Sequence, residues 1–175
     1  MDQNSPVDDD VTLSFTDLLE ANRRHHASFT GTGLPGRAGR GLAIVTCIDT
    51  RLDPLAMLGL EPGDAKIARN AGARVTDDVL RSLALSTALL GVDRIALIAH
   101  TDCALAKSTD EQLRAHVASA SGGDTSGWEP LAVTDQPGAV QDDVELIRRH
   151  PLIRPGVVVA GFVYDVDSGV LHALG

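Results

Sequence analysis

Aromatic residues are scarce in this chain of 175 residues, which contains three Phe, one Trp and one Tyr. Proteins that bind single-stranded nucleic acid usually stack its bases on aromatic side chains, so this scarcity argues against such a function. Basic residues are also few, because 15 Lys and Arg stand against 24 Asp and Glu and leave a net charge of −9. Binding to a phosphate backbone needs a basic face, and nucleic acid is therefore not an expected partner.

Long apolar runs and a basic leader are missing as well. No apolar run approaches the ~20 residues needed to span a bilayer. The first ten residues, MDQNSPVDDD, are acidic and polar, whereas a signal peptide would be basic and then apolar. We therefore expect a cytoplasmic protein with no membrane partner. The chain has only two cysteines, and in a reducing compartment these serve chemistry or metal binding rather than a disulfide.

The length favours one domain preceded by an arm, since a domain typically takes ~150 residues. We expect residues 1–40 to form an N-terminal arm with an amphipathic helix over residues 11–28, and residues 41–175 to form a single α/β domain. Residues 31–36 match the pattern G-x-G-x-x-G. They precede a strand and open no helix, so no dinucleotide-binding site is expected there.

Short apolar runs alternate with helical patterns over the second part of the chain, which predicts an α/β fold with a mainly parallel sheet flanked by helices. The helix over residues 77–90 begins after Thr76 and is apolar on most sides, so we expect it to be packed on both flanks. The last strand is close enough to pair antiparallel with the one before it. Strands are predicted at 41–47, 65–71, 94–100, 156–166 and 170–174, and further helices at 109–120 and 139–150.

Both cysteines lie where predicted strands end. Cys47 ends the first strand, and His100 and Cys103 follow the third. Sites in parallel sheets form at the carboxyl ends of the strands. Two thiolates and an imidazole suit zinc, and three protein ligands leave a fourth position open, as in catalytic sites. Two other readings remain: buried cysteines that act only as small apolar residues, and a redox pair of the two thiols.

A second pair of residues lies close to the first cysteine. Asp49 and Arg51 are two positions apart, so an extended chain places them on one side. They could form a structural ion pair with bidentate geometry. Beside a zinc ligand, Asp49 could instead accept a hydrogen bond from zinc-bound water or take the fourth position itself, and Arg51 would decide between the two by competing for the carboxylate.

The pattern Cys47-x-Asp49-x-Arg51 with His100-x-x-Cys103 resembles the β-class carbonic anhydrases, and most of all their archaeal and mycobacterial branch. The similarity covers about residues 41–175. One departure is Ala104, where the family usually has Gly after the second cysteine. The similarity also includes the segments Arg69-Asn70-Ala71-Gly72, Thr76-Asp77-Asp78 and the C-terminal GFVYDVDSGVLHAL.

This resemblance implies a zinc enzyme that reversibly hydrates carbon dioxide to bicarbonate and a proton by attack of zinc-bound hydroxide. Cys47, His100 and Cys103 would bind one Zn2+ per chain, and Asp49 and Arg51 would form the catalytic dyad. The implied fold is a four-stranded parallel core with an antiparallel fifth strand, in a homodimer or dimer-based tetramer whose cleft lies at the subunit interface. Two alternatives stay open: hydrolysis of carbonyl sulfide or carbon disulfide, and a non-catalytic zinc-binding protein.

Overall fold

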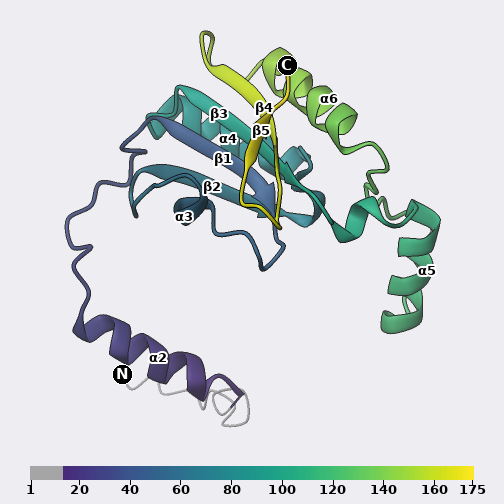
Figure 1. The fold of residues 1–175 in the computed structure, drawn as a ribbon, viewed down its shortest axis with the longest axis horizontal. Coiled ribbons are helices and arrows are strands. Elements are labelled where there is room, and N and C mark those ends of the chain that lie inside the picture. The colour runs from purple at the N-terminus through teal and green to yellow at the C-terminus, as the bar shows by residue number, and fades with distance from the viewer. Residues whose placement is uncertain (1–13) are drawn as a thin grey trace, which may run out of the picture. The chain divides into compact units, whose positions relative to one another are not determined.

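The computed structural model of the protein describes residues 14–175, which form two compact units, one ending at Leu34 and the other running from Pro35 to Gly175. The first unit contains helix α2, Thr16–Ala27 (Figure 1). Asp17 lies in its first turn and three basic residues lie in its last, which complements the helix dipole. The helix expected over residues 11–28 is thus confirmed, although residues 11–13 lie outside the described residues.

The second unit is built on a five-stranded sheet with the order β2-β1-β3-β4-β5. All neighbouring strands are parallel except β4 and β5, which are antiparallel, so the predicted sheet is confirmed. The central strand β1 is buried along its whole length, which explains why its sequence is a continuous apolar run rather than an alternating one. The strands are β1 Leu42–Cys47, β2 Ala65–Asn70, β3 Arg94–His100, β4 Val158–Tyr164 and β5 Leu171–Ala173.

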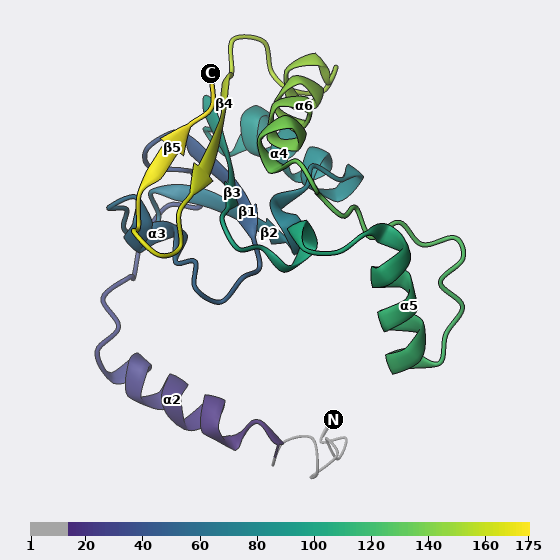
Figure 2. The same ribbon diagram turned by 45° about the vertical axis from the view of Figure 1, so that its right-hand side comes forward.

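Helices cover both faces of this sheet (Figure 2). Helices α4, Asp77–Leu89, and α6, Gln136–Arg149, pack on one face. The stripe expected on the second of these helices is buried there, at Val140, Val144 and Ile147. The single-turn helix α3, Pro54–Met57, lies on the other face beside a smaller apolar cluster.

Helix α4 is packed on one flank only within the single chain. Val79 and Leu83 are buried against the sheet, whereas Leu85 and Leu89 are 42% and 62% exposed. Within one copy of the chain only one of the two expected flanks is packed, so packing on the other flank stays a prediction for an assembly of chains. Thr76 occupies the N-cap position with an extended backbone, but its side chain makes no capping hydrogen bond.

Helix α5, Asp110–Ser121, is the surface helix that the sequence predicts, and it buries no side chain. It begins with a capping box in which Thr109 and Gln112 bond each other's main-chain N–H groups. Two short 3-10 turns, η1 Ala71–Ala73 and η2 Ala104–Ala106, follow β2 and β3. None of the helices in residues 14–175 is long and apolar enough to cross a membrane.

Candidate metal centre

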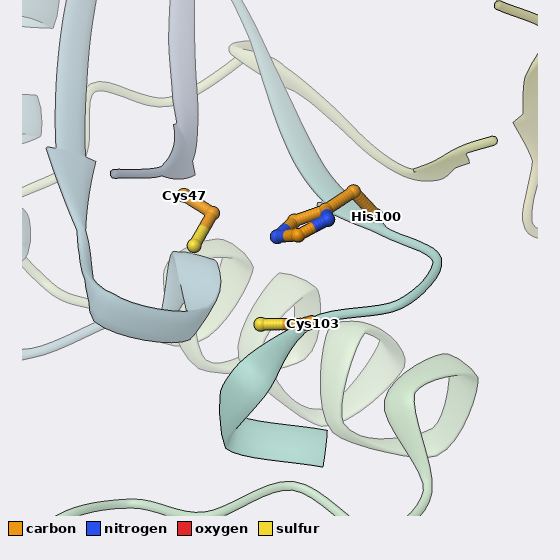
Figure 3. Close-up of side chains that lie close together, drawn as sticks. All are labelled: Cys47, His100 and Cys103. Carbon is orange, nitrogen blue, oxygen red and sulfur yellow. The ribbon is translucent and has the colours of Figure 1, made fainter. Parts of the chain in front are cut away.

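Three potential metal ligands meet at the carboxyl ends of two neighbouring strands (Figure 3). Cys47 is the last residue of β1, His100 is the last residue of β3, and Cys103 follows three positions later. One potential ligand atom from each lies within 4.8 Å of the others, and all three residues are buried. The parallel pairing of β1 and β3 brings these positions together although they are far apart in the sequence.

The histidine ring is oriented by a main-chain carbonyl. Nδ1 of His100 lies 2.8 Å from the carbonyl oxygen of Thr101. A carbonyl only accepts, so Nδ1 carries the proton and Nε2 presents a lone pair. Within the described residues, this buried Nε2 has no hydrogen-bond partner. A buried polar atom without a partner is costly, and a bound metal ion would satisfy it, so the ring fits a metal ligand.

The two thiols interact with each other. A hydrogen bond from Cys103 lowers the pKa of Cys47, against the opposing effect of burial. The same contact, together with burial, raises the pKa of Cys103. The main-chain N–H of Gly72 also donates to Sγ of Cys47 at 3.4 Å. Cys47 is thus stabilised as the thiolate, the form in which cysteine binds metal, and a metal ion would displace the remaining thiol proton.

A bidentate ion pair joins Asp49 and Arg51 just beyond the end of β1. Nε of Arg51 donates to Oδ1 of Asp49 at 2.9 Å, and Nη2 donates to Oδ2 at 2.8 Å. These hydrogen bonds hold the pKa of Asp49 well below its usual range. Oδ2 of Asp49 lies 3.8 Å from Nε2 of His100. The pair predicted from the sequence is therefore present, with its carboxylate beside the three potential ligands.

Arg69 shapes the loop that carries this pair, although the sequence singles it out only as part of a motif. Its guanidinium donates to the main-chain carbonyls of Cys47, Leu52 and Asp49 at 2.8, 3.2 and 2.7 Å. Arg69 pairs with Thr46 across the β1–β2 ladder, which places it beside this loop. One side chain thus satisfies three carbonyls at the end of β1 and in the loop that follows it.

The turn after β2 is closed by the side chain of Asn70. Its amide donates to the carbonyl of Arg74 at 2.6 Å and accepts from the N–H of Arg74 at 2.9 Å. Inside this turn Gly72 has a φ of 79°, and a Cβ there would lie 2.9 Å from Leu105. Glycine is therefore required at the position whose N–H reaches Cys47.

A buried ion pair that the sequence did not reveal anchors the same turn. Nε and Nη2 of Arg74 donate to the carboxylate of Asp143 at 2.8 and 3.2 Å, and the N–H of Val75 donates to it at 3.1 Å. The side chain of Asp143 is only 8% exposed. The helical stripe of α6 predicts which of its residues are apolar and inward, but gives no sign that an inward acid has a partner on another element.

Ala104, the departure from the usual glycine, causes no backbone strain. It begins η2 and is exposed, and its φ is not among the positive values of the described residues. The left-handed residue of this loop is Asp102, with a φ of 58°. The position after the second cysteine therefore has no conformational need for glycine in this chain.

Comparison with known proteins identifies the family. The family model described as carbonic anhydrase matches residues 42–123, which include all the residues of the candidate site. Beta-carbonic anhydrase 1 of Mycobacterium tuberculosis (strain H37Rv) is 38% identical over 160 residues, covering 91% of this chain and 98% of the relative. The chain belongs to the β-carbonic anhydrase family.

A solved structure agrees with this assignment, and a relative with another named activity is similar to this chain as well. The crystal structure of carbonic anhydrase from Streptococcus mutans has a TM-score of 0.87 and 36% identity, covering 92% of this chain and 97% of that one. The carbon disulfide hydrolase of Acidianus sp. (strain A1-3) is 33% identical over 159 residues, covering 78% of this chain and 77% of the relative. Proteins named for two different substrates are therefore similar to this chain.

Proposed function

We propose that this β-carbonic anhydrase uses zinc to hydrate carbon dioxide reversibly to bicarbonate and a proton. The observation that carries this proposal is the buried group formed by Cys47, His100 and Cys103. Within the described residues, Nε2 of His100 has no hydrogen-bond partner, and it lies beside the carboxylate of Asp49. A purely structural site would have no use for a carboxylate held by Arg51 at its edge. The chemistry of the three donors, two sulfurs and one imidazole nitrogen, matches what zinc prefers.

One zinc ion per chain would be held by Cys47, His100 and Cys103. Three protein ligands leave one position open, which distinguishes catalytic from structural zinc sites. When bound, zinc lowers the pKa of a coordinated water and so supplies a nucleophile near neutral pH. The metal ligands are oriented by main-chain groups. The carbonyl of Thr101 orients the imidazole of His100, and the N–H of Gly72 donates to the Cys47 thiolate.

Asp49 is proposed to act next to the ligands, and Arg51 to position it. Oδ2 of Asp49 lies 3.8 Å from Nε2 of His100, so the carboxylate could either accept a hydrogen bond from the nucleophile or take the fourth position itself. Arg51 donates to both carboxylate oxygens, so it competes for the lone pairs that coordination would use. The ion pair thus keeps Asp49 charged, oriented and available as a hydrogen-bond acceptor.

A second candidate function is hydrolysis of carbon disulfide or carbonyl sulfide. Its support is the 33% identity to a carbon disulfide hydrolase. Both substrates are linear molecules like carbon dioxide, so the same nucleophile could attack the carbon atom of either compound. We also propose that residues 1–40 form an arm to the zinc-enzyme domain at residues 41–175, and that the protein is a homodimer or dimer-based tetramer.

Metal analysis combined with stopped-flow hydration tests this function. Protein purified without chelator should contain about one zinc per chain, and Cys103→Ser should lose most of it because a soft ligand is replaced by a poor one. Carbon dioxide hydration should fall with the zinc content. Sulfide release from carbon disulfide, measured in parallel, tests the second candidate. Near-zero zinc in the unchanged protein, with the same value in Cys103→Ser, would rule out a zinc enzyme.

A further inference from the structure

Asp102 makes contacts that the proposed function leaves unexplained. It lies between His100 and Cys103, and its carboxylate is about half exposed. Nη1 of Arg51 donates to its Oδ2 at 2.7 Å, and Nη2 donates to its main-chain carbonyl at 3.1 Å. On its other side the carboxylate contacts the ammonium group of Lys107. Asp102 thus joins the loop after β3 to the loop after β1.

The guanidinium of Arg51 has enough N–H groups to hold both acids at once. Nε and one N–H of Nη2 face Asp49, while Nη1 and the second N–H of Nη2 face Asp102. The two carboxylates therefore do not compete for the same donors. Lys107 supplies a further positive charge, so the acids and bases alternate along this row. The hydrogen bonds to both acids raise the pKa of Arg51, which stays charged throughout.

A simpler explanation for an acid at this position is the backbone. Asp102 has a φ of 58°, a left-handed conformation that Gly, Asn and Asp tolerate better than other residues. Glycine or asparagine would meet this requirement equally well. Neither would place a carboxylate 2.7 Å from Arg51, so the conformation accounts for the small residue but not for its charge.

We propose that Asp102 is a positioning residue, whose carboxylate holds the guanidinium of Arg51 against Asp49 and thereby keeps Asp49 from occupying the fourth position at the metal site. The inference rests on the proposed function for its consequence, but its geometry concerns only side chains of this chain. Without the Asp102 carboxylate, Arg51 keeps its contacts to Asp49 and loses the strongest contact on its far side. Its side chain, 42% exposed, then leaves Asp49 more often.

The test compares Asp102→Asn and Asp102→Gly with the unchanged protein. Both variants tolerate the left-handed backbone, and both lose the charge. In 15N-labelled protein used as purified, without added metal or chelator, the Nε–H resonance of Arg51 is assigned by its disappearance in Arg51→Lys. Its hydrogen exchange should become about 2- to 5-fold faster in both Asp102 variants, the range expected for loss of one partly exposed ion pair. Hydration kcat should fall by a similar factor while zinc content stays unchanged.

Glu145→Gln is the matched control. Glu145 is 44% exposed and contacts two cations, Arg148 and Arg149, as Asp102 contacts Arg51 and Lys107. It should leave the Arg51 resonance and hydration unaltered. If Asp102→Gly keeps the exchange rate or the hydration rate of the unchanged protein, the backbone alone explains the residue and the proposal is wrong. Loss of zinc in either variant would also overturn it. An unchanged protein without zinc or hydration activity would contradict the proposed function, whereas the exchange data would still decide the role of Asp102.

Discussion

At the scale of single residues, one main-chain carbonyl determines which ring nitrogen of His100 can bind a metal. The carbonyl of Thr101 accepts a hydrogen bond from Nδ1–H, so Nε2 keeps the lone pair that a metal ion would use, and the sulfur atoms of Cys47 and Cys103 lie nearby. A peptide carbonyl cannot be removed by substitution of a side chain, so the backbone conformation after β3 fixes the orientation of the ring. The side chains around the ligands can be substituted, and among these Arg51 donates to both carboxylate oxygens of Asp49.

Arg51→Ala should lower carbon dioxide hydration about 10- to 100-fold while zinc remains bound. This is the usual cost of losing a residue that hydrogen-bonds to a group next to the metal. Without its partner, Asp49 is free to take the fourth position and exclude the nucleophile. Hydration rate and zinc content are measured on the same samples. Arg148→Ala is the control, since Arg148 is similarly exposed on α6 and lies outside the site. Zinc lost in proportion to activity would show that Arg51 is structural.

The spacing of residues in the sequence predicts that Cys47, Asp49, Arg51, His100 and Cys103 lie close together, as they do, but it does not predict the contacts that hold them. Each of the five lies at the end of a strand or within four positions of it, and strand ends are readable from apolar runs. Asp102 was not found because its partner Arg51 is 51 positions away, and only the β1–β3 pairing brings the two loops together.

At the scale of elements, the turn after β2 depends on an anchor in α6. Asp143 is buried and accepts hydrogen bonds from Arg74 and from the N–H of Val75. Removal of the Asp143 carboxylate leaves the guanidinium of Arg74 without its ion-pair partner. The Arg74 side chain is only 21% exposed, so this charge would be partly buried and unpaired. The turn also carries Gly72, whose N–H reaches the Cys47 thiolate. Stability and the geometry around the thiolate are therefore linked at this point.

Asp143→Ala should lower the free energy of unfolding by about 2–4 kcal/mol, slightly below the cost of breaking a fully buried pair because Arg74 keeps some contact with water. Chemical denaturation measures the change. Asp142→Ala is the matched control: the neighbouring acid is exposed on the same helix, and its loss should cost less than about 0.5 kcal/mol. Equal costs for the two variants would mean that the pair contributes only through its charge.

The turn between β4 and β5 gives a pH-dependent prediction. Oδ1 of Asp165 accepts from the N–H groups of Ser168 and Asp167 at 2.8 and 2.9 Å. These hydrogen bonds, chiefly those from Ser168, lower the pKa of Asp165. A carboxyl group with a lowered pKa stabilises the fold above its unfolded pKa, and this contribution is lost as the pH falls through the folded value.

Asp165→Asn should therefore reduce the loss of stability on going from about pH 5 to about pH 3, because its amide does not titrate but can still accept the two hydrogen bonds. The urea midpoint is measured at both pH values for the variant and the unchanged protein. Asp167→Asn removes a neighbouring charge without altering the oxygen that accepts both bonds, and it separates a local effect from a general one. Identical falls of the midpoint in Asp165→Asn and in the unchanged protein would contradict the prediction.

The elements themselves were largely predictable, and the exceptions have local causes. All five strands and the helices α2, α4, α5 and α6 follow from apolar patterns. Helix α6 begins three positions earlier than predicted, because Asp135 caps it and a proline lies in its first turn. The same signal, Asp53 followed by Pro54, marks α3, which is too short to have an apolar period. The turn η1 depends on Asn70 and on packing against Leu105, which no local pattern encodes.

At the scale of the whole molecule, the exposed flank of α4 is the main feature that the single chain leaves unexplained. Leu85 and Leu89 are one turn apart and face the same side of the helix, and they are 42% and 62% exposed. The neighbouring strand β2 is at the edge of the sheet, and its Ile67 is 39% exposed. An apolar flank beside an open sheet edge favours association with a second copy. This is the physical support for the proposed homodimer.

Leu85→Glu should weaken this association, because it places a charge where two apolar flanks would meet. Sedimentation of the unchanged protein should show a species of at least twice the 18.3 kDa chain mass, and the variant should shift toward a single chain on dilution. Leu146→Glu is the matched control, since Leu146 is 44% exposed on α6 and lies outside the α4 flank. Hydration activity measured at the same dilutions shows whether the site needs the second copy, as a cleft at a subunit interface would require. A folded, fully active unchanged protein that sediments near 18.3 kDa would contradict the dimer, and equal dissociation of both variants would place the interface elsewhere.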